Sequence, residues 1–138
     1  MELQVKKFSE LSTEELYEIL RLRVSVFVVE QKCPYMETDD LDQNALHMYF
    51  RDADGIKAYL RIIDKSDTRE YVTIGRVISV KRRRGIGTEL VREGIAWRWR
   101  CSAQIRYTLR RRSMLSRFMR IWVLSGYPMN SLKTEFRM

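Results

Sequence analysis

The stretch of sequence that decides the fold runs from residue 74 to residue 95 and reads IGRVISVKRRRGIGTELVREGI. Its first seven residues are mostly apolar and predict a strand, whereas Ile86, Leu90, Val91 and Ile95 recur at helical spacing. Between these segments lies a turn with four consecutive cations and two glycines. Glycine lets a backbone approach an anion closely, and the first free N–H groups of a helix point at it. The order of strand, cationic glycine turn and helix therefore predicts a phosphate-binding site, with a solvated turn as the alternative.

The residues before this stretch predict an opening strand, a helix and a meander of strands. Val5 belongs to the opening strand, and Ser12 with Glu15 forms a capping box for a helix from Thr13 to about Val26. Residues 47–51 and 56–63 read as two antiparallel strands, because a glycine-bearing turn separates them. A third strand is expected within residues 71–80.

Length and composition are those of one small globular domain. The chain has 138 residues, of which 45% are hydrophobic and 32% charged. Its first residues lack an apolar signal core and no run is long enough to span a membrane, so a cytosolic location is expected. Cys33 and Cys101 stand far apart without metal-ligand spacing, which predicts free thiols and no metal site.

The positive charge is confined to the end of the chain. Residues 1–96 contain 16 Lys and Arg against 17 Asp and Glu, whereas residues 97–138 contain 10 against 1, nine of the ten being arginine. All three tryptophans also lie in residues 97–138. The net charge of +8 therefore points to a nucleic-acid partner only if this tail is functional.

Several segments of the first 95 residues are similar to one protein family. They are residues 20–31 (LRLRVSVFVVEQ), residues 33–35 (CPY), Asp39, Asp40, His47, residues 74–77 and the spacing Arg82-x-x-Gly85-x-Gly87. Together they resemble the GCN5-related N-acetyltransferases, the GNAT superfamily, in its ElaA-like branch. Residues 1–96 then form the N-terminal part of an acetyltransferase domain, and residues 97–138 form an Arg- and Trp-rich tail outside the family pattern.

The resemblance implies an α/β fold with a mixed, mainly antiparallel sheet flanked by helices, incomplete at its C-terminal end. The strand ending near Val80 would hold the pantetheine of acyl-CoA through its backbone, and the amides of residues 83–88 would cradle the pyrophosphate. The residues so assigned to acyl-CoA are Ile78, Val80, Arg82, Arg83, Arg84, Gly85, Ile86, Gly87 and Thr88.

The reaction implied by the resemblance is transfer of an acetyl group from acetyl-CoA, the co-substrate, to an unidentified amine, without a metal. No motif identifies a catalytic base, although Glu30 and His47 are titratable and lie in the matching segments. A single histidine at the start of a strand is more often structural. The acidic residues from Glu37 to Asp42 either attract an amine substrate or form a solvated turn.

The family motifs expected after Ile95 are absent from the sequence as written. A neighbouring reading frame of residues 117–124 permits Phe-Tyr-Glu-Asn-Leu-Gly-Phe, and that of residues 129–138 permits the family's closing segment. We therefore hypothesise a frame change between about Gly94 and Arg98, which makes Trp97 to Met138 a non-native tail.

Three functions follow from these alternatives. The first is an N-acetyltransferase, whose activity the altered C-terminal half puts in doubt. The second is a polyanion-binding protein that uses the basic tail, and the third is a CoA-binding protein without turnover. The frame hypothesis explains the tail's charge without nucleic acid, and no membrane partner is expected.

Overall fold

The computed structural model describes residues 1–64 and 72–101, the last four of them by their backbone alone. Within these residues, four strands form one antiparallel sheet in the order β1-β2-β3-β4. The strands are β1 (Glu2–Lys7), β2 (Ala45–Asp52), β3 (Gly55–Ile63) and β4 (Thr73–Ser79). The meander expected from the sequence is confirmed, and every strand pair in the described part is antiparallel.

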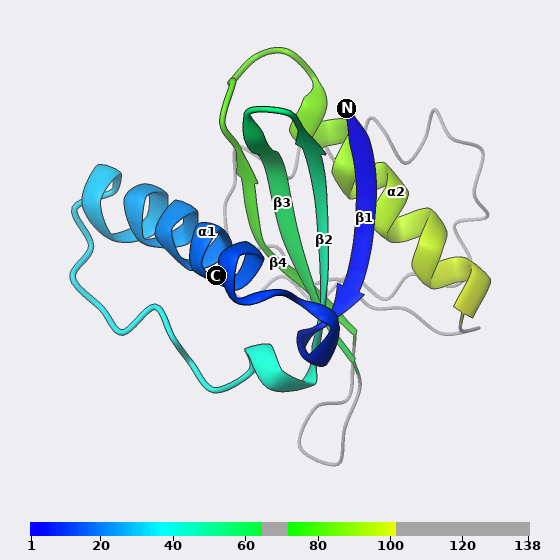
Figure 1. The fold of residues 1–138 in the computed structure, drawn as a ribbon, viewed down its shortest axis with the longest axis horizontal. Helices are drawn as coiled ribbons and strands as arrows, with labels where there is room; N and C mark the ends of the chain where they lie inside the picture. The colour runs from blue at the N-terminus through cyan, green and yellow to red at the C-terminus, as the bar shows by residue number, and fades with distance from the viewer. Residues whose placement is uncertain (65–71, 102–138) are drawn as a thin grey trace, which may run out of the picture.

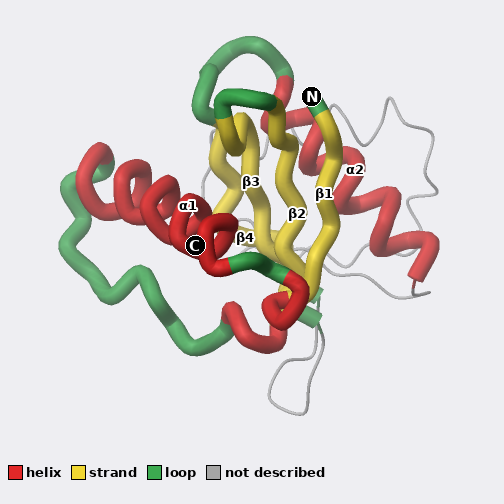
Figure 2. The backbone as a smooth tube through the Cα atoms, in the orientation of Figure 1, coloured by secondary structure: helices red, strands yellow, loops and turns green. Residues whose placement is uncertain are grey.

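Two helices cover opposite faces of the sheet. Helix α1 (Thr13–Arg23) lies on one face and helix α2 (Ile86–Cys101) on the other (Figure 1). The helix–sheet–helix layering is also visible in the tube drawing (Figure 2). The expected α/β fold with a mainly antiparallel sheet flanked by helices is thus confirmed.

Each helix packs on its own hydrophobic core, because successive side chains of a strand point to opposite faces of the sheet. Tyr49, Tyr59 and Ile78 pack with Ile19 beneath α1. The larger core, beneath α2, consists of Met48, Phe50, Ala58, Leu60, Ile62, Val72, Ile74, Leu90, Val91 and Ile95.

The start of α1 agrees with the prediction, and its end does not. The Ser12 hydroxyl accepts a hydrogen bond from the Glu15 amide (3.1 Å), and the Glu15 carboxylate accepts one from the Ser12 amide (2.9 Å). The predicted end near Val26 is wrong. The α-helix ends at Arg23, and the chain continues as a π-helix, η2 (Val24–Glu30). The amide of Gln31 still donates to the carbonyl of Val26, five residues back (3.2 Å). Four of the seven residues of η2 are valine, whose branched side chain slightly lowers α-helix propensity.

Two short 3-10 helices complete the described elements. Helix η1 (Phe8–Glu10) follows β1, and helix η3 (Asp42–Asn44) precedes β2. None of the described helices has the length and apolar character needed to cross a membrane.

Helix α2 runs past the boundary that the sequence suggested at residues 96 and 97. Trp97 is partly buried and packs against the core beneath α2. The segments of the tail that carry the frame hypothesis, residues 117–124 and 129–138, lie outside the described residues. The division of the chain at residue 96 therefore stays a prediction.

Candidate functional site

The cationic turn connects β4 to α2, as the sequence predicts. Gly85, directly before the helix, has a φ of +77°, a backbone conformation that glycine adopts without a steric penalty. The first intrahelical bond joins the Glu89 amide to the Gly85 carbonyl (2.9 Å). The amides of Ile86, Gly87 and Thr88 precede that bond and have no acceptor within the helix. The start of α2 therefore presents free N–H groups, to which an anion is attracted.

Gly87 allows α2 to begin close to the end of β4. A Cβ atom at this position would lie 3.2 Å from the Cβ of Ser79. That distance is shorter than an ordinary van der Waals contact, so a larger residue would push the helix away from the strand. The two glycines of the turn have different roles: Gly85 provides the backbone conformation, and Gly87 provides the space.

The backbone of β4 has a different register from the one expected. The Val80 amide donates to the Lys57 carbonyl (2.9 Å), so this amide is engaged with β3 and is not free for a ligand. Backbone groups alternate along an antiparallel strand, so those of Ile78 also face β3, and those of Ser79 face the outer edge. No described strand pairs with that outer edge. The backbone groups of Ile78 and Val80, which were expected to meet a ligand, thus face β3, and those of Ser79 face the outer edge.

The arginines of the turn are on the surface. Arg83 and Arg84 are exposed, and Arg83 adopts a positive φ of 62°. Arg82 forms an ion pair with Glu30, at the end of η2, and both side chains are largely exposed. Ile86 is partly buried and packs against the core beneath α2. The turn and the end of η2 are thus neighbours in space although about fifty residues separate them in the sequence.

The acidic loop is neither a solvated turn nor a free anionic patch. Three of its four carboxylates pair with arginines from three different elements, and these pairs close into a ring of alternating charge, whereas Asp40 is exposed. The ring runs through Arg23, Glu37, Arg76, Asp39, Arg61 and Asp42 and back to Arg23. We call these six residues the charge ring. The interpretation of the loop as a solvated turn is wrong, because Glu37 and Asp42 are buried against the arginines.

The contacts of the charge ring are short. Arg23 is completely buried and donates to Glu37 (2.7 Å) and to Asp42 (2.6 Å). Arg61 exposes 3% of its surface and donates to both oxygens of Asp39, each at 2.7 Å. Equal numbers of positive and negative groups meet in the ring, so its charges largely cancel. The three carboxylates of the ring therefore do not attract a cationic substrate by charge alone.

These contacts shift the pKa values of the carboxyl groups. Hydrogen bonds from Arg61 lower the pKa of Asp39 to about 2. Burial would raise the pKa of Asp42, but hydrogen bonds from Arg23 and Arg61 outweigh it and lower this pKa. Both groups are therefore ionised at neutral pH, which keeps the charge ring intact.

His47 lies inside the protein rather than in an open site. It is completely buried, and its Nε2 donates to the Asp42 carbonyl (3.1 Å). That assignment makes Nδ1 the acceptor of the Tyr59 hydroxyl (2.8 Å). Burial is the main influence on His47 and lowers its pKa, so the imidazole is neutral at neutral pH. Both ring nitrogens are occupied, which favours the structural interpretation over a catalytic base.

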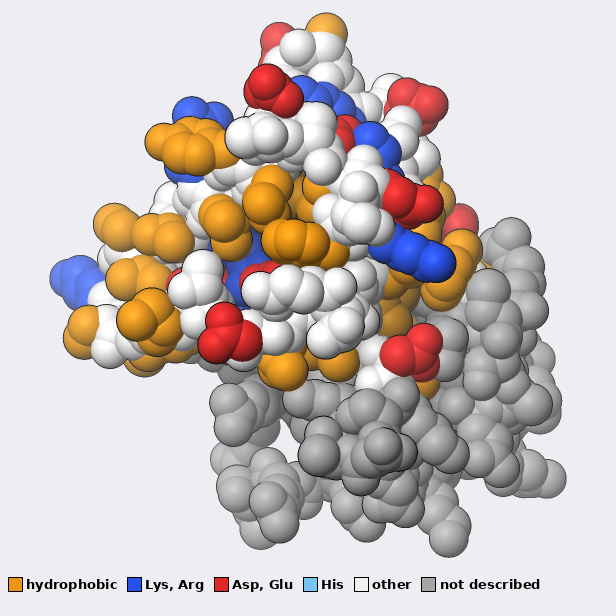
Figure 3. Space-filling model, turned by 60° about the horizontal axis from the view of Figure 1, so that its bottom comes forward, with side chains coloured by type: hydrophobic (Ala, Val, Ile, Leu, Met, Phe, Trp, Pro, Cys, Tyr) orange, Lys and Arg blue, Asp and Glu red, His pale blue; other side chains and the backbone are white. Residues whose placement is uncertain are grey.

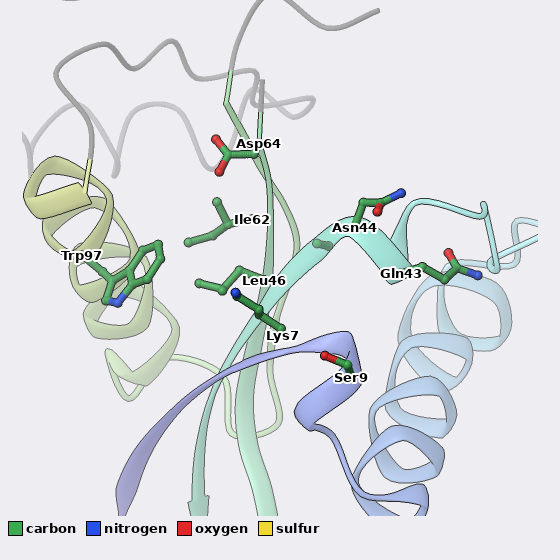
Figure 4. A pocket seen from close by; sticks show the side chains of 9 residues that line it. Lys7, Ser9, Gln43, Asn44, Leu46, Ile62, Asp64 and Trp97 are labelled. Atoms are coloured by element: carbon green, nitrogen blue, oxygen red, sulfur yellow. The ribbon is translucent and has the colours of Figure 1, made fainter. Parts of the chain in front are cut away.

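A separate cavity lies at the opposite end of the sheet from the cationic turn (Figure 4). It has a volume of about 300 Å³, and Trp97, Ile62 and Leu46 form its apolar wall. Lys7 and Asp64 lie at its rim (Figure 4). The sequence did not indicate this cavity, because its walls come from six different elements: β1, η1, η3, β2, β3 and α2.

The surface of the described residues mixes both charges. On the face shown in Figure 3, basic and acidic side chains are interspersed with apolar ones, and no broad area of one sign is visible. Within the same residues, no group of histidine, cysteine or acidic side chains is arranged to hold a metal ion.

Comparison with known proteins identifies the family. A UPF0039 protein of Schizosaccharomyces pombe is 40% identical over 98 residues, which are 69% of this chain and 64% of that protein. The crystal structure of Escherichia coli ElaA is 40% identical and superposes with a TM-score of 0.65, covering 70% of this chain and 68% of that one. The chain belongs to the ElaA-like branch of the GNAT superfamily. No protein-family model matches it.

A third relative of this ElaA-like chain is known by its activity class. An acyl-CoA N-acyltransferase of Pseudomonas aeruginosa is 38% identical with a TM-score of 0.68, covering 73% of this chain and 70% of that one. The chain spans only 57% to 64% of the length of the curated ElaA and UPF0039 relatives named here. The family assignment therefore rests on the part of the chain that these comparisons share.

Proposed function

We propose that this protein is an acyl-CoA-dependent N-acyltransferase, with acetyl-CoA as the donor and an amine as the acceptor. The observation that carries the proposal is the start of α2, with its free amides, beside the outer edge of β4, with which no described strand pairs, in a GNAT chain. The donor would place its pyrophosphate on the amides of residues 86–88 and its pantetheine along the Ser79 edge. Arg82, Arg83 and Arg84 would add positive charge around the phosphates.

The transfer needs one bond formed and one broken. The amine nitrogen attacks the thioester carbonyl carbon, the C–S bond breaks, and CoA leaves as a thiolate that takes up a proton. The proton lost by the amine passes to a base. His47 is unsuited to this role because it is buried with both nitrogens occupied, and the proposal assigns the base to no described residue.

Calorimetric titration of the full chain with acetyl-CoA tests the proposal. We expect saturable binding, and we expect the double variant Arg82→Ala/Arg84→Ala to weaken it by at least about tenfold, because loss of even one hydrogen bond to a charged group costs about 1.5 kcal/mol. The control is Arg92→Ala, an exposed arginine of α2 outside the turn, which should bind like the unchanged chain. Equal affinity in all three proteins would contradict the proposed site.

Turnover is tested separately, by detection of free CoA thiol in the presence of a panel of amines. Release that depends on both acetyl-CoA and an amine supports the transferase. Binding without release would instead indicate a CoA-binding protein. Tight RNA binding at moderate salt, without acetyl-CoA binding, would favour a polyanion-binding function, because salt weakens nonspecific binding to cations.

We also propose that residues 1–96 are the N-terminal part of the acetyltransferase domain and that residues 97–138 are a non-native tail. Sequencing the source DNA across the codons for residues 94–98, together with the intact mass of the natively expressed protein, tests this. A base gained or lost there supports the proposal. An unchanged reading frame, with a mass that matches the present sequence, contradicts it.

A further inference from the structure

The backbone of β4 is interrupted at Arg76. Tyr59 pairs with Ile78 and Arg61 pairs with Gly75, so one residue of β3, Leu60, stands opposite two residues of β4. This is a β-bulge, and Arg76 lies in it with a φ of +55°. Glycine is the residue that normally occupies this left-handed conformation, because it has no Cβ atom to clash. At Arg76 this unfavourable conformation coincides with a side chain that is held by several contacts.

The Arg76 side chain is held from several directions. Its Nε donates to Glu37 (2.8 Å), and a terminal nitrogen lies 3.3 Å from Asp39. The guanidinium also lies 5.7 Å from the ring centre of Phe27 and 5.8 Å from that of Tyr35. Cations are attracted to aromatic rings at such distances. Arg76 therefore connects the bulge of β4 to η2 and to the acidic loop.

The bulge decides which residue of β4 faces the outer edge, away from β3. A β-bulge shifts every later residue of its strand by one position relative to the partner strand, and a shift of one reverses the direction of the backbone groups. Without the bulge, the amide of Ser79 would face Lys57, and Ile78 and Val80 would face outward. With the bulge, the Val80 amide bonds to Lys57 and Ser79 faces the outer edge.

We propose that Arg76 is a positioning residue for the acyl donor. By anchoring the bulge to the charge ring, it sets the register in which β4 presents Ser79 to the pantetheine arm. This inference rests on the proposed acyl-CoA function. It predicts that loss of Arg76 weakens binding of the pantetheine arm but not of the pyrophosphate. The bulge acts on the edge of β4, whereas the pyrophosphate contacts belong to the start of α2.

The test compares two ligands, acetyl-CoA and adenosine 3′-phosphate 5′-diphosphate, which lacks the pantetheine arm. We expect Arg76→Ala to weaken acetyl-CoA about tenfold and to leave the nucleotide unaffected. Arg76→Gly tolerates the left-handed backbone and has no guanidinium, so it separates loss of the anchor from backbone strain. Arg76→Lys keeps the charge without the planar guanidinium, so its affinity for acetyl-CoA should lie between those of Arg76→Ala and the unchanged chain. The matched control is Arg51→Ala. It removes an arginine of β2 that pairs with Glu18 of α1 and lies outside the charge ring.

The outcomes distinguish this inference from the function on which it rests. Selective loss of acetyl-CoA affinity in folded Arg76 variants supports the positioning role. Unchanged affinity for both ligands, or a parallel loss of both, would overturn it while leaving the acyl-CoA function in place. Failure of the unchanged chain to bind either ligand would overturn the proposed function itself.

Site-resolved amide hydrogen exchange gives a second measurement that needs no ligand. In the unchanged chain the amide of Val80 should exchange slowly and that of Ser79 rapidly, because only the former is bonded to Lys57. We expect Arg76→Ala to reduce or invert this difference, and Arg51→Ala to preserve it. An identical exchange pattern in the two variants would contradict control of the register by Arg76.

Discussion

The backbone conformation at position 85 of the cationic turn favours glycine. Its φ of +77° is unfavourable for any residue with a Cβ atom, yet a Cβ there would meet nothing within 4 Å. Gly85→Ala should therefore lower the free energy of unfolding by about 1 kcal/mol through backbone strain alone. Urea denaturation measures this cost.

Gly75 provides the control for this prediction. A Cβ atom added at Gly75 would also meet nothing within 4 Å, but the φ of this glycine lies outside the left-handed region. Gly75→Ala should change the free energy of unfolding by less than about 0.5 kcal/mol. Equal costs for the two substitutions would show that the conformation of Gly85 is not the cause.

Glu30 competes for an arginine of the proposed donor site. Its carboxylate pairs with Arg82, and both side chains are largely exposed, so the ion pair is a weak one. Glu30→Gln removes this negative charge and should tighten acetyl-CoA binding by about two- to fivefold, in line with surface pairs of up to about 1 kcal/mol. Calorimetric titration measures the change.

The control is Glu14→Gln, an exposed glutamate in the first turn of α1. This substitution also removes one negative charge, but at a position that pairs with no arginine of the cationic turn. It should leave the affinity for acetyl-CoA unchanged. A weaker affinity in Glu30→Gln would contradict the competition and would assign Glu30 to donor binding instead.

At the level of the elements, α1 depends on its capping box. The Ser12 hydroxyl satisfies the amide of Glu15, one of the four N–H groups that a helix leaves unpaired at its start. Ser12→Ala should lower the free energy of unfolding by about 1 kcal/mol. Ser9→Ala, an exposed serine of η1, is the control and should have little effect. Urea denaturation of both variants tests this, and equal stability would show that the cap contributes nothing.

The sequence predicted the strands well because their signals are local. Residues 45–63 contain two mainly apolar runs on either side of a tight turn, and both features are present in the β2–β3 hairpin. The π-helix was missed because its five-residue spacing is not among the periodicities by which helices are recognised. The bulge at Arg76 was missed for a similar reason, since the usual signal for a left-handed residue in a strand is glycine.

For the molecule as a whole, hydrogen-bonded carboxylates inside and outside the charge ring predict how stability depends on pH. Burial opposes ionisation of Glu15, but hydrogen bonds from Lys6, Ser12 and Tyr49 lower its pKa from 4.5 to about 2. The pKa of Asp39 is lowered from 3.8 to about 2. A lowered pKa stabilises the folded state above the unfolded-state pKa, and this stability is lost as the pH falls toward the folded-state value.

His47 acts in the same direction at higher pH. Burial lowers its pKa below 6.5, so the unfolded chain takes up a proton first as the pH falls. We therefore expect the midpoint of thermal unfolding to decline below about pH 6.5 and steeply between about pH 4.5 and 2. Calorimetric melts at constant ionic strength measure the curve. Asp39→Asn should flatten its acid limb, and a stability that rises between pH 4.5 and 2 would contradict the prediction.

The sequence by itself determined the local parts of the site: the strand, the glycine turn and the helix start follow from residues 74–95. Their signals lie within a few residues, where backbone preference and periodicity act. Only the tertiary structure decided the charge ring, because Arg23, Arg61 and Arg76 come from α1, β3 and β4. It also decided which backbone groups of β4 face away from β3, since strand register depends on a partner strand that no local pattern specifies.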